Sequence, residues 1–576
     1  MPSGLPSGKG GSGMLPSRIH GDTGNTNNAK SFTSENGQTW RFPKEHTDQV
    51  MDTAMLDSDI CYRALQTRDA RFDGRFFTGV TSTGIYCRPI CPARTPMRGH
   101  CRFFPSAAAA QQAGFRACLR CRPEIAPQSP AWRGTASTVS RAMARIEEGA
   151  LDGAGASVEQ LAASLGVGER QLRRLFDRHV GASPLAVAQT RRVLFAKQLL
   201  HETRLPMASV AMAAGFGSIR RFNDTFRALY KRPPSQLRRR SVSPSANAPL
   251  MLRLPYRPPF DWEALLAFFA ARAIPGVEEV RDGIYRRVVR VDNHVALIAV
   301  SHLPARNALQ VEVACDHVPI LPVIAVRLRR VFDLDADTEA ITAHLSRDRI
   351  LAGELRRRPG LRIPGGWNAF EVGVRAILGQ QISVAAARGL AAKLVAISTP
   401  PVASNDPNLN HAFPTAHQLA SADLSAIGMP AARRNALSSL ARAAIAHPEI
   451  FEAASTLEEN IARLRSIPGI GEWTAQYIAL RGLHHPDAFP AADIGILRNA
   501  EQVLGMRLSP VGTRLSPAQL LARSEQWRPW RGYAAQHLWS ASSIKRAPRR
   551  KSSAISSSRM PLLPPISNTA TTGATV

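Results

Sequence analysis

The chain has 576 residues, and its 73 Lys and Arg against 44 Asp and Glu give a net charge of +29 and a pI of about 11.1. This length admits three or four domains, and the charge favours a polyanionic partner, with nucleic acid ahead of a membrane surface. The sequence contains neither a run of about 18 apolar residues nor a basic start followed by an apolar core, so we expect a soluble, intracellular protein with no membrane partner.

The two ends of the chain differ in composition from its middle. Residues 1–54 are rich in Gly, Ser, Asn, Thr and Pro, and residues 541–576 begin basic and end polar, so we predict disorder in both. A stretch of small residues and prolines, 241–250, is predicted to be a linker. Composition and motifs divide the remainder into four predicted domains: 55–130, 131–240, 251–330 and 331–540.

Five of the seven cysteines fall between positions 87 and 121. GIYCRPICPAR contributes Cys87 and Cys91, and GFRACLRCRP contributes Cys118 and Cys121, which gives two close pairs separated by 26 residues. Two such pairs suit a tetrahedral zinc site. Two disulfides or free thiols are the competing interpretation, which a reducing compartment and the pair spacing disfavour. The other three cysteines are expected to pack in the core: Cys61, Cys101 and Cys315.

The wider stretches TSTGIYCRPICPART and AAGFRACLRCRPE resemble the N-terminal domain of Ada, the bacterial alkylation-response family. The resemblance implies a small zinc-binding α/β domain. It also implies that Cys87 is both a zinc ligand and the acceptor of a methyl group from a DNA phosphotriester, in a suicidal transfer. The remaining zinc ligands would be Cys91, Cys118 and Cys121.

The charge of such a site predicts a switch. Four thiolates on Zn²⁺ carry a net charge of −2, which repels a phosphodiester but not a neutral methyl phosphotriester. Methylation turns one thiolate into a neutral thioether, so the site falls to −1 and its affinity for DNA should rise. Nearby arginines are candidate phosphate contacts, with plain solvated charges as the competing interpretation: Arg88, Arg94, Arg98 and Arg102.

Residues 131–240 contain two helix-turn-helix patterns. SVEQLAASLGVGERQLRRLFDRHVG predicts a turn at Gly166 and a second helix from about Glu169, and PMASVAMAAGFGSIRRFNDTFRALYKRPPSQLR repeats this plan with a turn near Gly215–Gly217. The pair resembles the DNA-binding domain of AraC-type regulators. The resemblance implies DNA contacts from Arg170, Gln171, Arg173, Arg174, Ser218, Arg220, Arg221 and Asn223.

Residues 251–330 change in character. A helix is expected at about Trp262–Arg272, followed by the β-rich runs GIYRRVVRV, HVALIAV and ALQVEVACD. The last run alternates, which places Leu309, Val311, Val313 and Cys315 on one face. This segment resembles the small α/β subdomain that opens AlkA-type enzymes.

Residues 331–540 return to a helical pattern centred on SIPGIGEWTAQYIALRGLHHPDAFPAAD. Gly469 and Gly471 lie in a turn between two predicted helices, the second running from Glu472 to about Leu483. Unpaired N–H groups at the start of that helix suit a backbone phosphate. A nucleotide held there would lie at a fixed distance from Asp493, although a helical turn with a surface aspartate is the competing interpretation.

This run resembles the helix-hairpin-helix DNA glycosylases of the AlkA type, which act on 3-methyladenine. The resemblance implies that Asp493 is catalytic. Bifunctional members carry a lysine nucleophile where Trp473 stands, so a monofunctional glycosylase is expected. Trp473, Tyr477 and Trp539 would form an aromatic slot for a cationic base, with core packing as the alternative, and Arg481 is expected to reach outward.

A second helical pair, GGWNAFEVGVRAILGQQISVAAARGLAAKL, is expected to turn near Gly379–Ser383. In AlkA-type relatives, an apolar residue of this turn fills the gap left by the flipped base. Gln381 stands at the matching position and departs from that pattern.

The sequence therefore predicts a multidomain, mostly α-helical protein: a zinc-binding α/β domain, a double helix-turn-helix domain, an α+β subdomain and an all-α helix-hairpin-helix domain. We predict a monomeric bacterial cytoplasmic, nucleoid-associated protein that senses DNA alkylation, regulates transcription and excises N-alkylated purines such as 3-methyladenine. Its partners would be alkylated and promoter double-stranded DNA, with RNA polymerase as a further candidate. The alternative is a transcriptional regulator whose glycosylase half is a catalytically inert DNA-binding module.

Overall fold

The computed structural model describes residues 57–126, 137–153, 155–238, 250–402, 406–453, 456–503 and 515–541, together with two short strands, β1 (Phe32–Thr33) and β2 (Thr39–Trp40). The chain divides into two compact units, Met1–Met55 and Leu56–Val576. Apart from β1, β2 and the residues at 250 and 541, the predicted tails and linker lie outside the described residues. Within the described ranges, no helix is both long and apolar enough to cross a bilayer.

The first domain of the larger unit is a small four-stranded sheet in the order β5-β3-β4-β6, in which only the β4–β6 pair is parallel. Its elements are α1 (Ser58–Thr67), β3 (Phe77–Val80), β4 (Ile85–Cys87), β5 (Cys101–Phe104), α2 (Ala107–Gln112) and β6 (Arg116–Ala117). Cys61 and Cys101 are buried, which confirms their predicted packing role. The predicted α/β class of this domain is therefore confirmed.

Seven helices follow: α3 (Ser137–Glu147), α4 (Val158–Ser164), α5 (Glu169–Val180), α6 (Pro184–Glu202), α7 (Met207–Ala213), α8 (Ile219–Tyr230) and α9 (Pro234–Leu237). Each helix-turn-helix passes through a glycine at positive φ, +73° at Gly166 and +85° at Gly215, where a side chain would be strained. The two predicted turns and the start of α5 at Glu169 are confirmed. The long helix α6 separates the two motifs.

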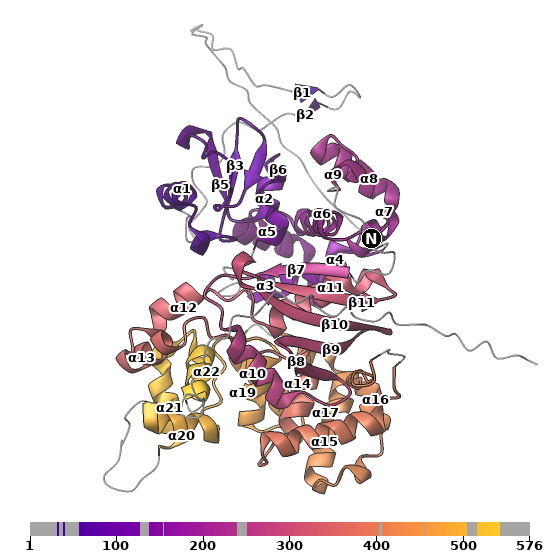
Figure 1. The fold of residues 1–576 in the computed structure, drawn as a ribbon, viewed down its shortest axis with the longest axis vertical. Coiled ribbons are helices and arrows are strands. Elements are labelled where there is room, and N and C mark those ends of the chain that lie inside the picture. The colour runs from indigo at the N-terminus through magenta and orange to yellow at the C-terminus, as the bar shows by residue number, and fades with distance from the viewer. Residues whose placement is uncertain are drawn as a thin grey trace, which may run out of the picture. The chain divides into compact units, whose positions relative to one another are not determined.

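A five-stranded antiparallel sheet in the order β7-β11-β10-β9-β8 forms the next part (Figure 1). It consists of β7 (Leu250–Pro255), β8 (Glu278–Arg281), β9 (Ile284–Val291), β10 (His294–Leu303) and β11 (Ala308–Cys315), with α10 (Trp262–Arg272) and α11 (Leu321–Val331) beside it. The predicted alternation is confirmed, because Leu309, Val311 and Val313 are fully buried and Cys315 is partly buried against the same core. The helix predicted at Trp262–Arg272 has those bounds.

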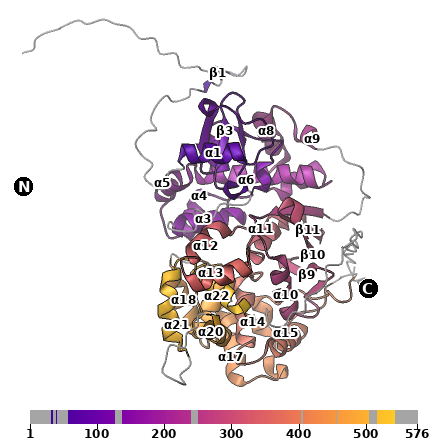
Figure 2. The same cartoon turned by 60° about the vertical axis from the view of Figure 1, so that its left-hand side comes forward.

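The region predicted at 331–540 is helical, as predicted, and its helices gather in the orange and yellow part of the chain (Figure 2). They are α12 (Thr338–Leu345), α13 (Arg349–Arg357), α14 (Ala369–Leu378), α15 (Val384–Ser398), α16 (Ala416–Ser421), α17 (Ala431–Ala446), α18 (Leu457–Arg465), α19 (Glu472–Arg481), α20 (Ile494–Val503), α21 (Pro517–Ser524) and α22 (Arg531–Ala541). A shared apolar core that includes Val374, Leu440 and Ile478 holds α14, α17 and α19 together. Burial of such side chains contributes about 1.5–3 kcal/mol each.

A buried polar cluster joins the small first domain to α6 and to the five-stranded sheet. Lys197 Nζ lies 2.6 Å from Glu124 Oε2 and donates to the carbonyl oxygen of Cys118 at 2.9 Å. At the end of α6, Glu202 accepts a hydrogen bond from the backbone N–H of Arg253 in β7 at 3.0 Å. Charges buried this deeply need such partners. These contacts therefore hold the first domain, α6 and β7 against one another.

Candidate functional site

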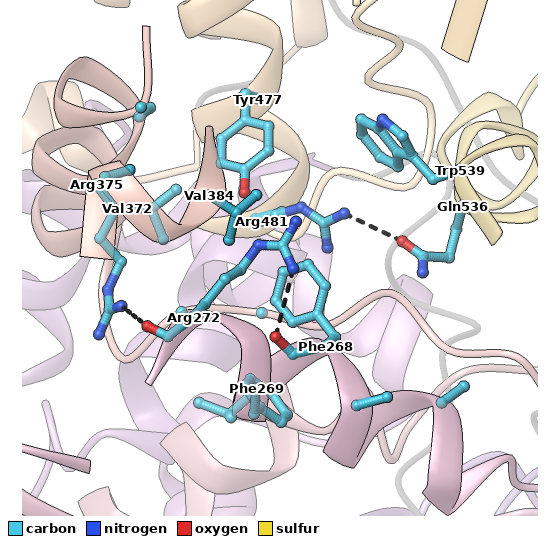
Figure 3. A pocket seen from close by; sticks show the side chains of 18 of the residues that line it. Phe268, Phe269, Arg272, Val372, Arg375, Val384, Tyr477, Arg481, Gln536 and Trp539 are labelled. Atoms are coloured by element: carbon cyan, nitrogen blue, oxygen red, sulfur yellow. Dashed lines mark hydrogen bonds between the residues drawn. The ribbon is translucent and has the colours of Figure 1, made fainter. Parts of the chain in front are cut away.

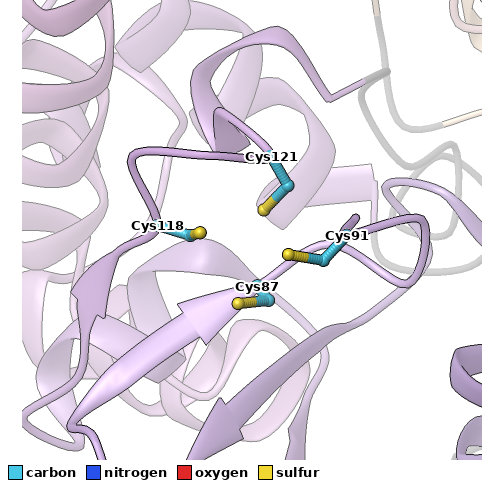
Figure 4. A group of neighbouring side chains, drawn as sticks. All are labelled: Cys87, Cys91, Cys118 and Cys121. Atoms are coloured by element: carbon cyan, nitrogen blue, oxygen red, sulfur yellow. The ribbon is translucent and has the colours of Figure 1, made fainter. Parts of the chain in front are cut away.

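Four cysteine thiols meet at one point of the small domain (Figure 4). Cys87 ends β4, Cys91 lies in the loop after it, and Cys118 and Cys121 follow β6. All four are buried, and their Sγ atoms lie within 4.8 Å of one another. Tetrahedral zinc with bonds of about 2.3 Å needs sulfur atoms about 3.8 Å apart, so this set fits zinc.

Backbone amides support the thiol cluster. The N–H of Arg88 donates to Cys121 Sγ at 3.3 Å, and the N–H of Arg120 donates to Cys118 Sγ at 3.4 Å. Hydrogen bonds of this kind stabilise thiolates and orient metal ligands. The four cysteines predicted as metal ligands thus come together, and the chemistry of these donors confirms the predicted zinc cofactor.

The side chain of Arg88 is not available to a phosphate, so its prediction as a phosphate contact is wrong. It is buried, pairs with Asp73 and donates from Nη1 to the carbonyl oxygen of Cys121 at 3.0 Å. Arg94 and Arg102 are exposed, so both stay candidates. The sequence offered no signal for the Arg88 ion pair, because Asp73 lies outside the cysteine motifs and reaches Arg88 only through the fold.

The predicted hairpin joins α18 to α19. Gly469 has φ +90°, and a Cβ at that position would lie 2.4 Å from Ala436 Cβ on α17. Gly471 precedes α19 without a side-chain cap, so the first N–H groups of α19 depend on other partners. The hairpin therefore has the geometry that favours a bound phosphate.

Gly469→Ala should lower the free energy of unfolding by about 1–3 kcal/mol, because a left-handed φ and a steric clash act together. Gly471→Ala is the matched control, since φ there is −85° and an added Cβ meets nothing within 4 Å. Urea unfolding of both variants checks the difference. Equal stability of the two alanine variants would contradict this account of the hairpin.

Asp493 is held by three donors. Its Oδ1 accepts from the backbone N–H of Ile496 at 3.0 Å, which caps the start of α20, and from Trp539 Nε1 at 2.8 Å. Its Oδ2 accepts from Trp473 Nε1 at 2.9 Å. The capping role was not predicted, although an aspartate directly before the helical run IGILRNA could have indicated it.

The three predicted aromatic residues come together. The rings of Trp473 and Tyr477 stack at 5.3 Å between centroids, and Trp539 meets Tyr477 edge-on at 6.5 Å. All three are half-buried and line a cavity of about 890 Å³ between α10, α14, α15, α19 and α22, and Asp493 lies on its wall. Figure 3 shows Tyr477 and Trp539 in this cavity. Trp473 and Trp539 thus line the cavity and also orient the carboxylate, a role that the sequence did not predict.

Arg481 does not reach outward, so that prediction is wrong. It is 4% exposed and lines the same cavity, because α10 and α22 cover this face of α19. Its Nη1 donates to the carbonyl oxygen of Pro364 at 2.8 Å and its Nη2 to Gln536 Oε1 at 3.1 Å. Burial lowers the pKa of Arg481 to about 10, so the guanidinium stays charged at neutral pH.

Phe268 and Arg272 of α10 also line the cavity and were missed, since nothing near the hairpin points to them.

Gln381 lies in the turn between α14 and α15, where the turn was predicted. It is exposed, has φ +57° and does not line the cavity, whereas its neighbour Ile382 does. Gln380 ties the turn to α19 through a 3.1 Å hydrogen bond from Nε2 to Thr474 Oγ1. A gap-filling role for Gln381 stays a prediction.

The predicted DNA-contacting residues of the helix-turn-helix motifs are displayed on α5 and α8. Ser218 caps α8, because its hydroxyl accepts from the N–H of Arg221 at 3.1 Å. Asn223 is half-buried, and Arg173 pairs with Glu169 one turn earlier. The exposed members of the set are Arg170, Gln171, Arg173, Arg174, Ser218, Arg220 and Arg221.

Three family models match the chain. They are the metal binding domain of Ada over residues 60–124, a helix-turn-helix domain over 161–240 and the AlkA N-terminal domain over 251–368. The first two ranges lie inside the predicted domains 55–130 and 131–240, whereas the third runs past the predicted boundary at 330 into the predicted fourth domain.

Known proteins match most of the chain, or one of its parts. The probable bifunctional transcriptional activator/DNA repair enzyme AlkA of Mycobacterium tuberculosis is 44% identical over 491 residues, which cover 84% of this chain and 96% of that protein. DNA-3-methyladenine glycosylase 2 of Escherichia coli is 36% identical over 50% of this chain and 96% of its own length. The regulatory protein ada of Salmonella typhimurium is 32% identical over 29% of this chain and 45% of its own length.

Proposed function

Because this chain belongs to the family of the bifunctional transcriptional activator/DNA repair enzymes AlkA, we propose that Asp493 and Cys87 carry its two reactions. The chain is a DNA repair enzyme in which an Ada-type metal-binding domain and a helix-turn-helix domain precede a 3-methyladenine glycosylase region. Release of N-alkylated purines by the second half is supported above all by one observation. Two indole N–H groups hold the Asp493 carboxylate on the wall of a cavity beside the hairpin.

The glycosylase reaction follows from this arrangement. The damaged nucleotide leaves the stack and enters the cavity, while the hairpin N–H groups at Gly469 and Gly471 hold a backbone phosphate. An N-alkylated purine is cationic and leaves readily, so the enzyme must mainly stabilise positive charge on the sugar. The fixed carboxylate of Asp493 does so and can also orient the attacking water. Trp473 stands where a lysine nucleophile would be needed for strand cleavage, so water is the nucleophile.

The methyl transfer takes place at the cysteine cluster. Zinc, when bound by Cys87, Cys91, Cys118 and Cys121, keeps these thiols deprotonated at neutral pH. Cys87 Sγ attacks the methyl carbon of a phosphotriester, and the phosphate oxygen leaves as the anionic phosphodiester. A thioether replaces one thiolate, so the negative charge facing DNA falls by one.

The partners follow from the same surfaces. We propose that α5 and α8 contact promoter DNA through the arginines that they expose, and that the hairpin contacts damaged duplex. The regulatory half would then present RNA polymerase with a DNA-bound activator. We further propose that the protein acts as a monomer.

Incubation with duplex DNA that contains 3-methyladenine tests the glycosylase activity. Wild type should release the free base and leave an abasic strand that breaks only after alkali treatment. Breakage without alkali would contradict the monofunctional mechanism. If no base were released, the inert-module alternative would hold.

A further inference from the structure

The aromatic part of the cavity already contains a cation of the protein. The guanidinium carbon of Arg481 lies 4.6 Å from the ring centroid of Phe268, 4.8 Å from that of Trp539 and 5.3 Å from that of Tyr477 (Figure 3). These distances are typical of cation–π contacts, the interaction that was predicted between the aromatic rings and a cationic base. The aromatic slot therefore already contains a positive charge that belongs to the protein.

Arg481 forms no ion pair with a carboxylate among the described residues, so no adjacent negative charge balances its guanidinium. Its partners are neutral: the carbonyl oxygen of Pro364, the amide oxygen of Gln536 and the side chain of Tyr477. Its Nε is buried and has no hydrogen-bond partner in the described part of the chain. Burial is the main cause that lowers the pKa of Arg481, and the guanidinium of Arg272 lowers it further, whereas Tyr477 and Asp493 favour the charged form.

Positive charge in this position affects two kinds of damaged base in opposite ways. When the bond between C1′ and the base nitrogen breaks, its electron pair stays on the base. A cationic base becomes neutral, so a nearby guanidinium gives it no help and repels it before cleavage. A neutral base becomes an anion, and a fixed, desolvated cation beside it stabilises the developing charge.

We propose that Arg481 is a specificity-determining residue that stabilises the departing base when the damaged base is neutral and carries hydrogen-bond acceptors. The charged guanidinium, which is held beside the aromatic rings of the cavity, offsets the negative charge that develops on such a base. Water adds at C1′ and loses a proton towards Asp493 or solvent, and the released anion takes up a proton from solvent. This inference rests on the proposed glycosylase function.

The test compares two duplexes, one with a single 7-methylguanine as the cationic base and one with a single hypoxanthine as the neutral base. Single-turnover release of each base is measured for wild type, Arg481→Met, Arg481→Lys and Gln536→Met. Arg481→Met should lower the ratio of hypoxanthine to 7-methylguanine release by about 10²-fold, which is the size of effect seen when one charge-stabilising donor is removed. Arg481→Lys, which keeps the charge, should restore part of that ratio.

Gln536→Met is the matched control, because it removes a hydrogen bond of Arg481 and keeps the guanidinium. Gln536→Met should leave the ratio of hypoxanthine release to 7-methylguanine release unchanged, even if it changes the two individual rates. Equal slowing of both bases by Arg481→Met would show a packing role only and would overturn the inference. If the wild-type protein released 7-methylguanine but no hypoxanthine, the inference would also be overturned, although the proposed function would remain. Release of neither base would instead remove the proposed function.

Discussion

Replacing Asp493 with asparagine should slow the release of free 3-methyladenine from duplex DNA by about 10³-fold. Asparagine has nearly the same shape, and its Oδ1 can still accept from the N–H of Ile496, so the cap of α20 survives. The substitution removes the negative charge that faces the sugar cation. It also replaces Oδ2, the acceptor for Trp473 Nε1, with an amide group that cannot accept. Single-turnover release, followed by chromatography of the free base, measures the loss.

A second capping aspartate offers a matched control. Asp261 accepts from the N–H of Ala264 at 3.0 Å at the start of α10 and lines the same cavity, but no indole N–H in the described part of the chain holds it. Asp261→Asn should therefore retain most of the wild-type release rate. Equal rates for wild type and Asp493→Asn would remove the catalytic assignment. If Asp493→Asn and Asp261→Asn slowed base release to a similar extent, the loss of any negative charge in the cavity would explain the effect, and Asp493 would have no special role.

The local parts of the fold were predictable from the sequence because short-range chemistry decides them. The glycines at 166, 215 and 469 mark turns, and period-two alternation marks β11, where the predicted Leu309, Val311 and Val313 are buried. The four zinc ligands were predictable for the same reason, since each pair is close in sequence and the spacing alone brings two thiols together.

The contacts that complete the sites depend on elements far apart in the chain. Arg481 is buried because α10, some two hundred residues earlier, places Phe268 against it. Arg88 is buried because Asp73 lies beside it in the folded domain. A periodic pattern tells which face of a helix is apolar, but it does not tell which distant helix will cover that face. Both errors concern arginines, whose long side chains can be buried or exposed from the same backbone position.

Replacing Cys87 with alanine should abolish the response of the protein to methylating agents. In wild type, affinity for a promoter fragment should rise roughly tenfold or more after treatment, since one unit of charge at about 4 Å from a phosphate is worth about 1 kcal/mol in water and more where solvent is excluded. Cys87→Ala has no acceptor thiol, so its affinity should be the same before and after treatment. Fluorescence anisotropy with a labelled fragment measures the affinities, and zinc content is assayed on the same samples.

The control is Cys101→Ala, because Cys101 is also a buried thiol of this domain but lies outside the cluster and donates from Sγ to the carbonyl oxygen of Met97 at 3.4 Å. Cys101→Ala should keep the full rise in affinity, and peptide mass spectrometry should find the added methyl group on Cys87. The salt dependence gives an independent measure of the same event. A site that has lost one negative charge repels the phosphates less, so the gain in affinity should shrink as ionic strength increases. A rise in affinity that persists in Cys87→Ala, or that does not depend on salt, would show that charge at this cluster does not control DNA binding.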